Sequence, residues 1–305
     1  MNIFHYYPKV LPVKKYGGTE RMAVNLMKEQ VNRGHKVYLL TLTGTHLPSI
    51  NVTTTKKPIR NFEDYIPDNI DIVQLYSTPQ EPPTKPYLVM IGGNGKPGEK
   101  FLPNTVFVSR NHAIRHGSRH YIYNGIKLEY FTYNEKKENY FLFLSKVSWK
   151  VKNVDFAIRL AKMMGFKLIV AGGWRLSFRR NIKFVGEVDA KEKAELLAGA
   201  KALIFPTNWE EPFGLVTIEA LASGTPVITT NKGAMPELVT PDVGFRCNTF
   251  EEFQEAINRA DEISPRKCRE RVEENFTAEI MTGKYIKAYE KIIQTGSLEG
   301  LGEEN

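Results

Sequence analysis

The amino-acid sequence predicts an α/β protein made of two domains, each with a parallel β-sheet. The chain has 305 residues, about twice the length of a common single domain. Short apolar segments typical of buried strands alternate with amphipathic segments of helical length, which is the pattern of parallel strands joined by helices. The alternation stops at the polar stretch 132–139 and then starts again. We therefore place a domain boundary there, between residues 136 and 137.

The first domain, residues 1–136, is expected to begin with a strand, a helix and a second strand. These elements cover residues 2–7, 19–33 and 37–42, and apolar residues recur along the helical segment about every three or four positions. The region 45–67 has no clear pattern, so no element is predicted there. Further apolar runs predict strands at residues 70–75, 87–91, 105–108 and 121–123.

The second domain, residues 137–275, is expected to repeat the alternation from a strand at 140–144. Its other elements are helices at 154–164, 190–198 and 214–222 and strands at 167–171, 182–185, 202–205 and 226–229. A last helix is expected at 276–295, and the Gly- and Glu-rich tail 296–305 is expected to be disordered. Two such domains in tandem should leave a cleft between the carboxyl ends of their strands, where open α/β sheets bind ligands.

The composition excludes several classes of protein. Hydrophobic residues at 42% and charged residues at 25% are typical of a folded, soluble chain. No apolar run approaches the roughly 18 residues of a transmembrane helix, and residues 1–7 resemble a strand rather than a secretion signal, so we expect a cytoplasmic protein. Cys247 and Cys268 are too few for a disulfide framework or a zinc site, and the six histidines lack metal-ligand spacing.

The formal net charge of +8 concerns partners rather than fold. The basic loops Val10–Tyr16 and Arg110–Arg119 are candidates for contact with an anionic membrane or a phosphorylated acceptor, although ordinary solubility explains them equally well. Nucleic acid is not an expected partner, because Lys and Arg are not interleaved with aromatic residues on one face.

The strongest motif lies at residues 209–228, WEEPFGLVTIEALASGTPVI. A strand ends before it, and we expect a helix to open close to Pro212. Its first turn would present backbone amides and the positive end of the helix dipole to an anion or to sugar hydroxyls. The amides concerned are those of Phe213, Gly214 and Leu215.

Two carboxylates, Glu211 and Glu219, flank this expected helix start. Eight residues of helix span roughly 12 Å, about the distance from the ribose of a nucleotide-sugar to its hexose. A carboxylate suits vicinal hydroxyls because it accepts two hydrogen bonds. The pair is too far apart for a glycosidase acting on one bond. The alternative is that Glu211 caps the helix and Glu219 lies on a solvated face.

Two further features point to a phosphate ligand. Lys146 follows a strand end and Lys152 precedes a helix, so both ammonium groups could neutralise a diphosphate, although surface lysines are common at strand ends. Gly17 and Gly18 precede the first helix, where a backbone can approach a phosphate. They lack the spacing of a dinucleotide-binding fold or a P-loop, so neither NAD binding nor ATP hydrolysis is favoured.

Together these motifs resemble glycosyltransferase family 4, whose members are retaining, nucleotide-sugar-dependent enzymes. Glu211 to Glu219, with Pro-Phe-Gly between, is similar to the E-x7-E motif of that family, and Lys146 with Lys152 to its basic pair. The other similar segments are Gly17–Arg21, Ile122–Ile126, Gly233–Glu237 and Phe276–Tyr289. Two departures are Gly92–Gly95, where the family commonly has a His, and Ser145-Lys146, where many members have Gly-Arg.

The resemblance implies a GT-B fold, in which two Rossmann-like domains with parallel sheets face a central cleft and the last helix packs back on the first domain. It implies a metal-independent hexosyltransferase that takes a UDP- or GDP-sugar and retains the anomeric configuration. By this resemblance, Glu219 would bind the ribose. The sugar hydroxyls and the phosphate would be held by Glu211 and by the backbone amides of Phe213, Gly214, Leu215 and Val216. The leaving diphosphate would be stabilised by Lys146 and Lys152, with Gly17 and Gly18 assisting. A sugar phosphorylase or a sugar-nucleotide epimerase on the same fold is the alternative.

Overall fold

The computed structural model describes residues 1–13, 17–59, 61–95 and 98–300, and the chain folds into two compact units. One unit contains Met1–Gly125 together with Ala278–Asn305, and the other contains Ile126–Thr277.

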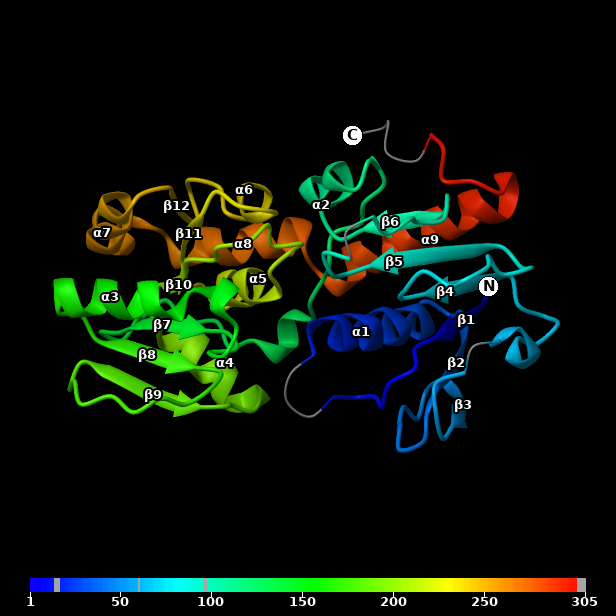
Figure 1. Cartoon of the computed structure of the whole chain (residues 1–305), viewed down its shortest axis with the longest axis horizontal. Helices are drawn as coiled ribbons and strands as arrows, with labels where there is room; N and C mark the ends of the chain where they lie inside the picture. The colour runs from blue at the N-terminus through cyan, green and yellow to red at the C-terminus, as the bar shows by residue number, and fades with distance from the viewer. Residues whose placement is uncertain (14–16, 60, 96–97, 301–305) are drawn as a thin grey trace. The chain divides into compact units, whose positions relative to one another are not determined.

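The first unit is built on a six-stranded parallel sheet in the order β3-β2-β1-β4-β5-β6 (Figure 1). This is the strand order of a doubly wound fold, so the predicted α/β class is confirmed here. The strands are β1 Asn2–Tyr6, β2 Lys36–Leu42, β3 Asn51–Thr55, β4 Ile72–Leu75, β5 Tyr87–Ile91 and β6 Thr105–Phe107. The helices are α1 Gly18–Asn32, η1 Glu63–Tyr65, α2 Arg110–Arg115 and α9 Ala278–Thr295.

In this unit one strand was missed and one strand prediction was wrong. Strand β3, Asn51–Thr55, was not predicted; it is an edge strand with largely exposed threonines, so it lacks the apolar run of a buried strand. The predicted strand at 121–123 forms just an isolated bridge between Tyr121 and Phe107.

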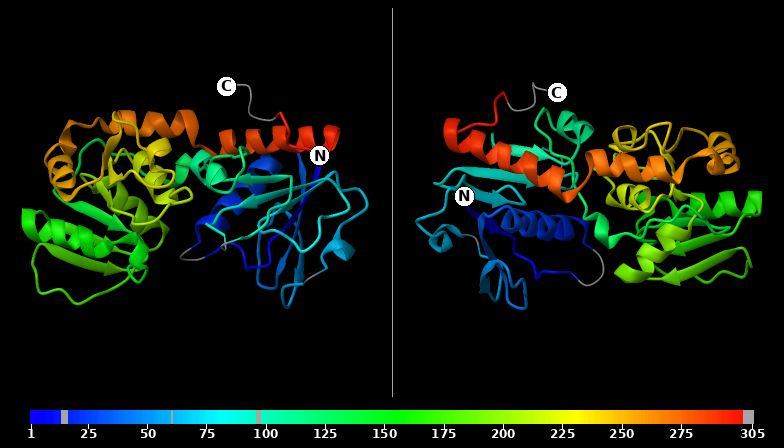
Figure 2. Two further views of the ribbon diagram at one scale, coloured as in Figure 1. Left: turned by 45° about the horizontal axis from the view of Figure 1, so that its top comes forward. Right: turned by 180° about the vertical axis from the view of Figure 1, so that it is seen from behind.

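A buried polar chain joins helix α9 to the sheet of the first unit, and both views of Figure 2 show α9 beside that sheet. His5 on β1 contacts Gln30 on α1 at 2.9 Å, and Gln30 donates to the Tyr289 hydroxyl at 3.2 Å. Tyr289 in turn donates to Gln74 on β4 at 2.7 Å. Burial lowers the pKa of His5 to about 3, so this imidazole is neutral. The last helix is therefore part of the polar core of the first unit.

The second unit repeats the doubly wound arrangement, with a six-stranded parallel sheet in the order β12-β11-β10-β7-β8-β9. Its central strands are continuous apolar segments that are buried on both faces. The strands are β7 Phe141–Leu144, β8 Leu168–Ala171, β9 Ile182–Gly186, β10 Leu203–Phe205, β11 Val227–Thr230 and β12 Gly244–Cys247. The helices are η2 Leu128–Tyr130, η3 Lys150–Lys152, α3 Val154–Met164, α4 Ala190–Gly199, α5 Leu215–Ala222, α6 Met235–Leu238, α7 Phe250–Asn258, η4 Ala260–Glu262 and α8 Pro265–Asn275.

The observed units differ from the predicted domains at their boundaries. Residues 126–136 belong to the second unit, because the Ile126 amide donates to the Phe276 carbonyl at 2.9 Å and the Asn134 amide donates to the Ser223 carbonyl at 3.4 Å. Part of the predicted disordered tail is ordered as well: Leu298 is buried and its amide donates to Asn104 at 3.2 Å. Residues 301–305 of that tail lie outside the described part of the chain.

Lys137 gives the second unit a predicted pH dependence of stability. Its ammonium donates to Ala198 O, Ser223 O and Thr225 Oγ1 at 2.9, 3.1 and 3.0 Å, and burial lowers its pKa to about 8. Between about pH 8 and the ordinary lysine pKa, the unfolded chain holds a proton that the folded chain has lost, so stability from this group rises with pH in that window. Urea unfolding at pH 7.5 and 9.5 should show the wild type gaining stability relative to Lys137→Met. If the difference in free energy of unfolding between the wild type and Lys137→Met were the same at both pH values, the carbonyl groups would be keeping the Lys137 amine protonated.

Candidate functional site

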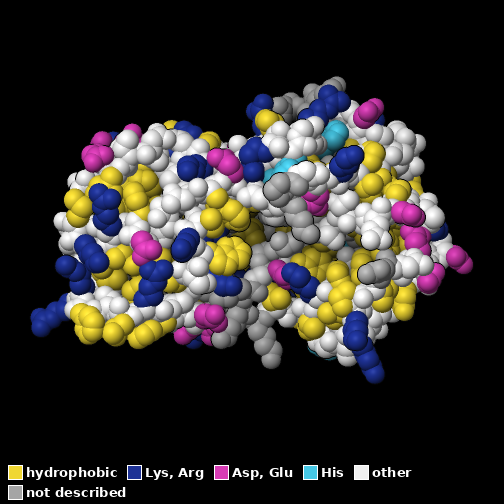
Figure 3. All heavy atoms as spheres, viewed as in Figure 1, with side chains coloured by type: hydrophobic (Ala, Val, Ile, Leu, Met, Phe, Trp, Pro, Cys, Tyr) yellow, Lys and Arg dark blue, Asp and Glu magenta, His cyan; other side chains and the backbone are white. Residues whose placement is uncertain are grey.

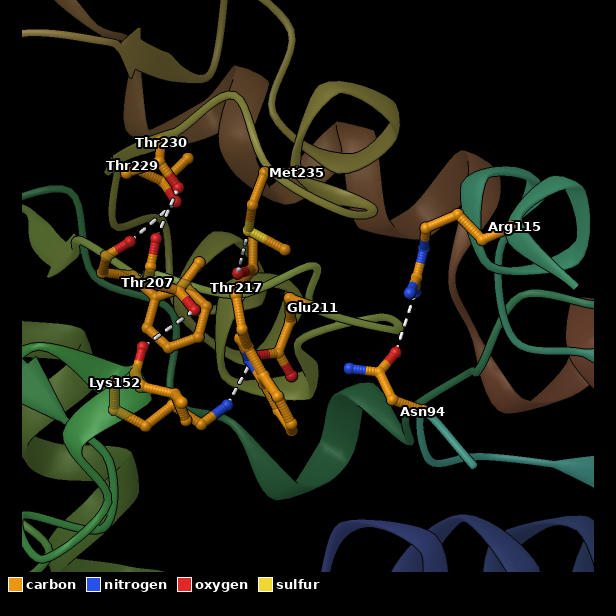
Figure 4. A network of polar contacts seen from close by, with 12 residues as sticks. Asn94, Arg115, Lys152, Thr207, Glu211, Thr217, Thr229, Thr230 and Met235 are labelled. Carbon is orange, nitrogen blue, oxygen red and sulfur yellow. Dashed lines mark hydrogen bonds and ion pairs between the residues drawn. The ribbon is translucent and has the colours of Figure 1, made fainter. Parts of the chain in front are cut away.

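Glu211 forms a buried ion pair at the carboxyl edge of the second sheet, on the loop between β10 and α5. Its Oε2 atom accepts from Lys152 Nζ at 2.5 Å, and Figure 4 shows these two residues. The same Oε2 atom accepts from Trp209 Nε1 at 2.5 Å. Glu211 and Lys152 are 7% and 8% exposed. The ammonium also lies 4.9 Å from the ring centroid of Trp209 and 5.2 Å from that of Phe205. Aromatic rings thus enclose the charge pair, which strengthens the attraction between its partners.

Backbone and hydroxyl contacts fix the turn that carries Lys152. This residue ends the short helix η3, and Asn153 takes a left-handed conformation with φ of 59° before α3 begins. The Val151 carbonyl accepts from the Asn208 amide at 2.7 Å and from Thr207 Oγ1 at 3.4 Å. These hydrogen bonds join the loops that follow β7 and β10. They thereby bring Lys152 into contact with Glu211, although the two residues are far apart in the sequence.

Gly233, on the loop between β11 and α6, supports Glu211 from the other side. The Gly233 amide donates to Glu210 Oε2 at 2.7 Å, and the Ala234 amide donates to the Glu211 carbonyl at 2.9 Å. Gly233 has φ of +59°, and a Cβ atom placed on it would overlap the backbone N and O of Glu211. Only glycine therefore fits at this position.

We expect Gly233→Ala to destabilise the chain more than a left-handed conformation alone explains. Gly165 is the matched control, since it has φ of +77° and open space where a Cβ atom would lie. Gly165→Ala should cost about 1–2 kcal/mol from backbone strain, and Gly233→Ala should cost more because the Glu211 backbone must also move. Urea unfolding measures both, and equal losses would contradict this account of Gly233.

Helix α5 begins at Leu215, which agrees within one residue with the predicted helix 214–222, whereas the expected opening turn close to Pro212 was wrong. Gly214, with φ of 87°, is the N-cap, and its left-handed backbone keeps the preceding residues out of the helix. Phe213 is buried, with its ring 6.1 Å from that of Phe276. The first-turn amides are those of Leu215 and Val216, and both residues are half-buried. Glu211 lies in a loop, so the helical-rise estimate of its distance from Glu219 does not apply.

Glu219 forms a second ion pair with a partner that sequence reasoning missed. Lys193 Nζ lies 2.5 Å from Glu219 Oε1, and both side chains are largely buried. Lys193 belongs to α4, and its ammonium is 5.2 Å from the Phe131 ring centroid. No spacing rule links Lys193 to Glu219, because their contact depends on how α4 and α5 pack. Trp209 was also missed as a partner of Glu211, although it lies inside the quoted motif.

Lys146 is exposed, and two indole rings connect it to the Lys152–Glu211 pair. Its Nζ lies 5.4 Å from the Trp149 ring centroid, and the rings of Trp149 and Trp209 meet edge to face at 6.3 Å. The structure thus pairs Lys152 with Glu211, while Lys146 is exposed and contacts the Trp149 ring.

Gly17 and Gly18 belong to the first unit, at the start of α1. Gly17 has φ of +143°, and a Cβ there would lie 2.8 Å from Glu20 Oε2. Glu20 also pairs with Lys9 at 2.6 Å, so an acidic side chain of the same chain occupies this helix start. Residues 14–16 of the adjacent basic loop Val10–Tyr16 lie outside the described residues.

The predicted basic loop Arg110–Arg119 was wrong in its first half, because Arg110–Arg115 form helix α2, and the Arg115 side chain turns toward the glycine-rich segment 92–95. Arg115 Nη2 donates to Asn94 Oδ1 at 2.8 Å (Figure 4).

Three further observations concern metals, thiols and membranes. Among the described residues, there is no group of three or more His, Cys, Asp or Glu side chains that could hold a metal ion. Cys247 and Cys268 are free, and burial raises the pKa of both thiols to about 12. Among the described helices, none combines the length and apolar character needed to cross a bilayer.

Comparison with known proteins shows that the second unit is similar to a family of glycosyl transferases. Residues 129–277 match the family model for glycosyl transferases group 1. The O-antigen chain mannosyltransferase RfbU of Salmonella typhimurium is 32% identical over 133 residues, which is 39% of this chain and 37% of that protein. The chain spans no more than 38% of the length of the first curated relatives that it matches.

Solved structures extend the likeness to both units. A glycosyltransferase involved in avilamycin A biosynthesis has a TM-score of 0.79 at 20% identity, covering 96% of this chain and 98% of that one. Anabaena HepE, crystallised with UDP and glucose, has a TM-score of 0.69 at 15% identity, covering 94% of this chain and 99% of that one. At these identities the likeness concerns the fold, and it confirms the predicted GT-B class. The second unit is therefore similar to the group 1 glycosyl transferases over residues 129–277.

Proposed function

We propose that this chain is a retaining glycosyltransferase of the family 4 type, which moves a hexose from a UDP- or GDP-sugar to an acceptor without a metal ion. The observation that carries the proposal is the buried Lys152–Glu211 pair beside the N-terminus of α5, at the sheet edge where doubly wound folds bind ligands. The mannosyltransferase name of one relative and the UDP and glucose bound by Anabaena HepE support a nucleotide-sugar donor.

In this proposal each group has one task. Lys152 and Trp209 hold Glu211 through Oε2, which leaves Oε1 to accept a hydrogen bond from a donor sugar hydroxyl. The amides of Leu215 and Val216, with the helix dipole, bind the diphosphate. Lys146 adds positive charge as the leaving group departs. Glu219, oriented by Lys193, binds the ribose hydroxyls.

The proposed reaction exchanges one bond at the anomeric carbon. The bond from that carbon to the diphosphate oxygen breaks, and the acceptor hydroxyl attacks from the same face. The hydroxyl proton passes to the departing phosphate oxygen, so the products are a nucleoside diphosphate and a glycoside of unchanged configuration. No protein nucleophile is required.

A thermal-shift screen with UDP-, GDP-, ADP- and dTDP-sugars tests the donor, because a ligand that binds only the folded chain raises its melting temperature. Product analysis by NMR then gives the anomeric configuration, and an assay in EDTA tests metal independence. An assay with inorganic phosphate as acceptor separates a transferase from a phosphorylase. The proposal fails if no nucleotide-sugar shifts the melting temperature at millimolar concentration.

A further inference from the structure

The loop between β8 and β9 exposes three large apolar side chains. Trp174, Leu176 and Phe178 are 67%, 66% and 90% exposed, and they are spaced two residues apart. In an extended segment this spacing places successive side chains on one side. Figure 3 shows hydrophobic side chains in a row over the segment that leads into β9, along the lower left margin, with Lys and Arg side chains nearby. Side chains of this size gathered on a surface commonly mark a binding site.

Specific contacts hold the base of this loop against the second unit. Gly173 forms an antiparallel bridge with Gly186 at the end of β9, which is the edge strand. Arg175 pairs with Asp155 at 2.6 Å and donates to the Val147 carbonyl at 3.2 Å. The chain is thus held at Gly173 and at Arg175, while Trp174, Leu176 and Phe178 are exposed instead of filling the core.

The charges beside the apolar residues are positive. Arg179 and Arg180 are exposed, and Lys183 on β9 is exposed nearby. Within the described residues no acidic side chain pairs with any of these three, whereas Arg175 is neutralised by Asp155. This charge opposes pairing of β9 with the edge strand of a second copy, because like charges would meet. The positive charge favours binding of this loop to an anionic surface.

We propose that loop Trp174–Arg180 docks on an anionic lipid bilayer. The indole ring of Trp174 suits the polar-apolar boundary of a membrane, and Leu176 and Phe178 would enter the acyl region beneath it. Arg179 and Arg180 would contact lipid phosphates. This inference does not depend on the proposed function, because vesicle binding is measured without a donor or an acceptor.

Co-sedimentation with vesicles of phosphatidylcholine containing 30 mol% phosphatidylglycerol tests the proposal. The wild type should bind, and Arg179→Ser/Arg180→Ser should weaken binding roughly tenfold or more, as expected for the loss of two surface charges. Leu176→Ser/Phe178→Ser should weaken it at least as much. Met163→Ser, which alters a 61% exposed side chain on α3, is the matched control and should bind as the wild type does. Binding of the wild type should fall in 0.5 M salt and with pure phosphatidylcholine.

Trp174 also provides a direct optical readout. Its fluorescence should shift to shorter wavelength when vesicles are added, and Trp174→Phe should remove that shift. The proposal is overturned if the wild type does not bind these vesicles, or if the loop variants bind as well as Met163→Ser. It is also overturned if Ile114→Ser/Arg119→Ser in the first unit abolishes binding while the loop variants do not. Concentration-dependent dimerisation that is lost in Leu176→Ser/Phe178→Ser, without vesicle binding, would assign the loop to self-association instead.

Discussion

Replacing Glu211 by Gln should lower kcat/KM with the preferred nucleotide-sugar by about 10²–10³-fold, the usual effect of losing one preorganised electrostatic group. The amide can still accept from Lys152 and Trp209, so the loop should keep its shape, but the negative charge is lost. Steady-state kinetics with the donor found in the thermal-shift screen measure the effect.

Glu195→Gln is the control for this substitution. Glu195 lies on α4 in the same unit, and its side chain is 64% exposed. This variant should have the kinetics of the wild type. If Glu211→Gln kept its activity within a few-fold while remaining folded, Glu211 would be a purely structural residue.

Replacing Lys152 by Met should both destabilise the second unit and weaken donor binding. Removal of one partner from a buried ion pair leaves an uncompensated charge and costs about 3–5 kcal/mol. The double variant Lys152→Met/Glu211→Gln should recover much of that stability, because it leaves no buried carboxylate, but it should not recover donor binding. Urea unfolding measures the stability, and calorimetric titration with the donor measures the binding.

Lys150→Met provides the comparison in the same turn, since Lys150 is an exposed lysine of η3. It should change the free energy of unfolding by less than about 0.5 kcal/mol, as surface substitutions usually do. Equal losses for Lys150→Met and Lys152→Met would show that the Lys152–Glu211 contact contributes nothing to folding.

The local sequence predicted most strands and helices because their cause is local. Runs such as Phe141–Leu144 and Leu168–Ala171 are apolar at every position, as expected for strands buried on both faces. The exposed edge strand β3 lacks such a run, and its pairing with β2 decided its structure. The opening turn expected close to Pro212 was wrong, because Pro212 suits a first helical turn but the left-handed Gly214 delays the helix to Leu215.

The fold class, the family resemblance and the residue types of the candidate site can be predicted from the amino-acid order, since periodicity and motif spacing are local features of the chain. The pairing of the charges depends on tertiary packing. Lys152 pairs with Glu211, and Glu219 with Lys193, because parallel strands bring separate loops to one edge and helices pack side by side. Such contacts join residues far apart in sequence, and the free energy that selects them comes from burying the surrounding core, which no local pattern records.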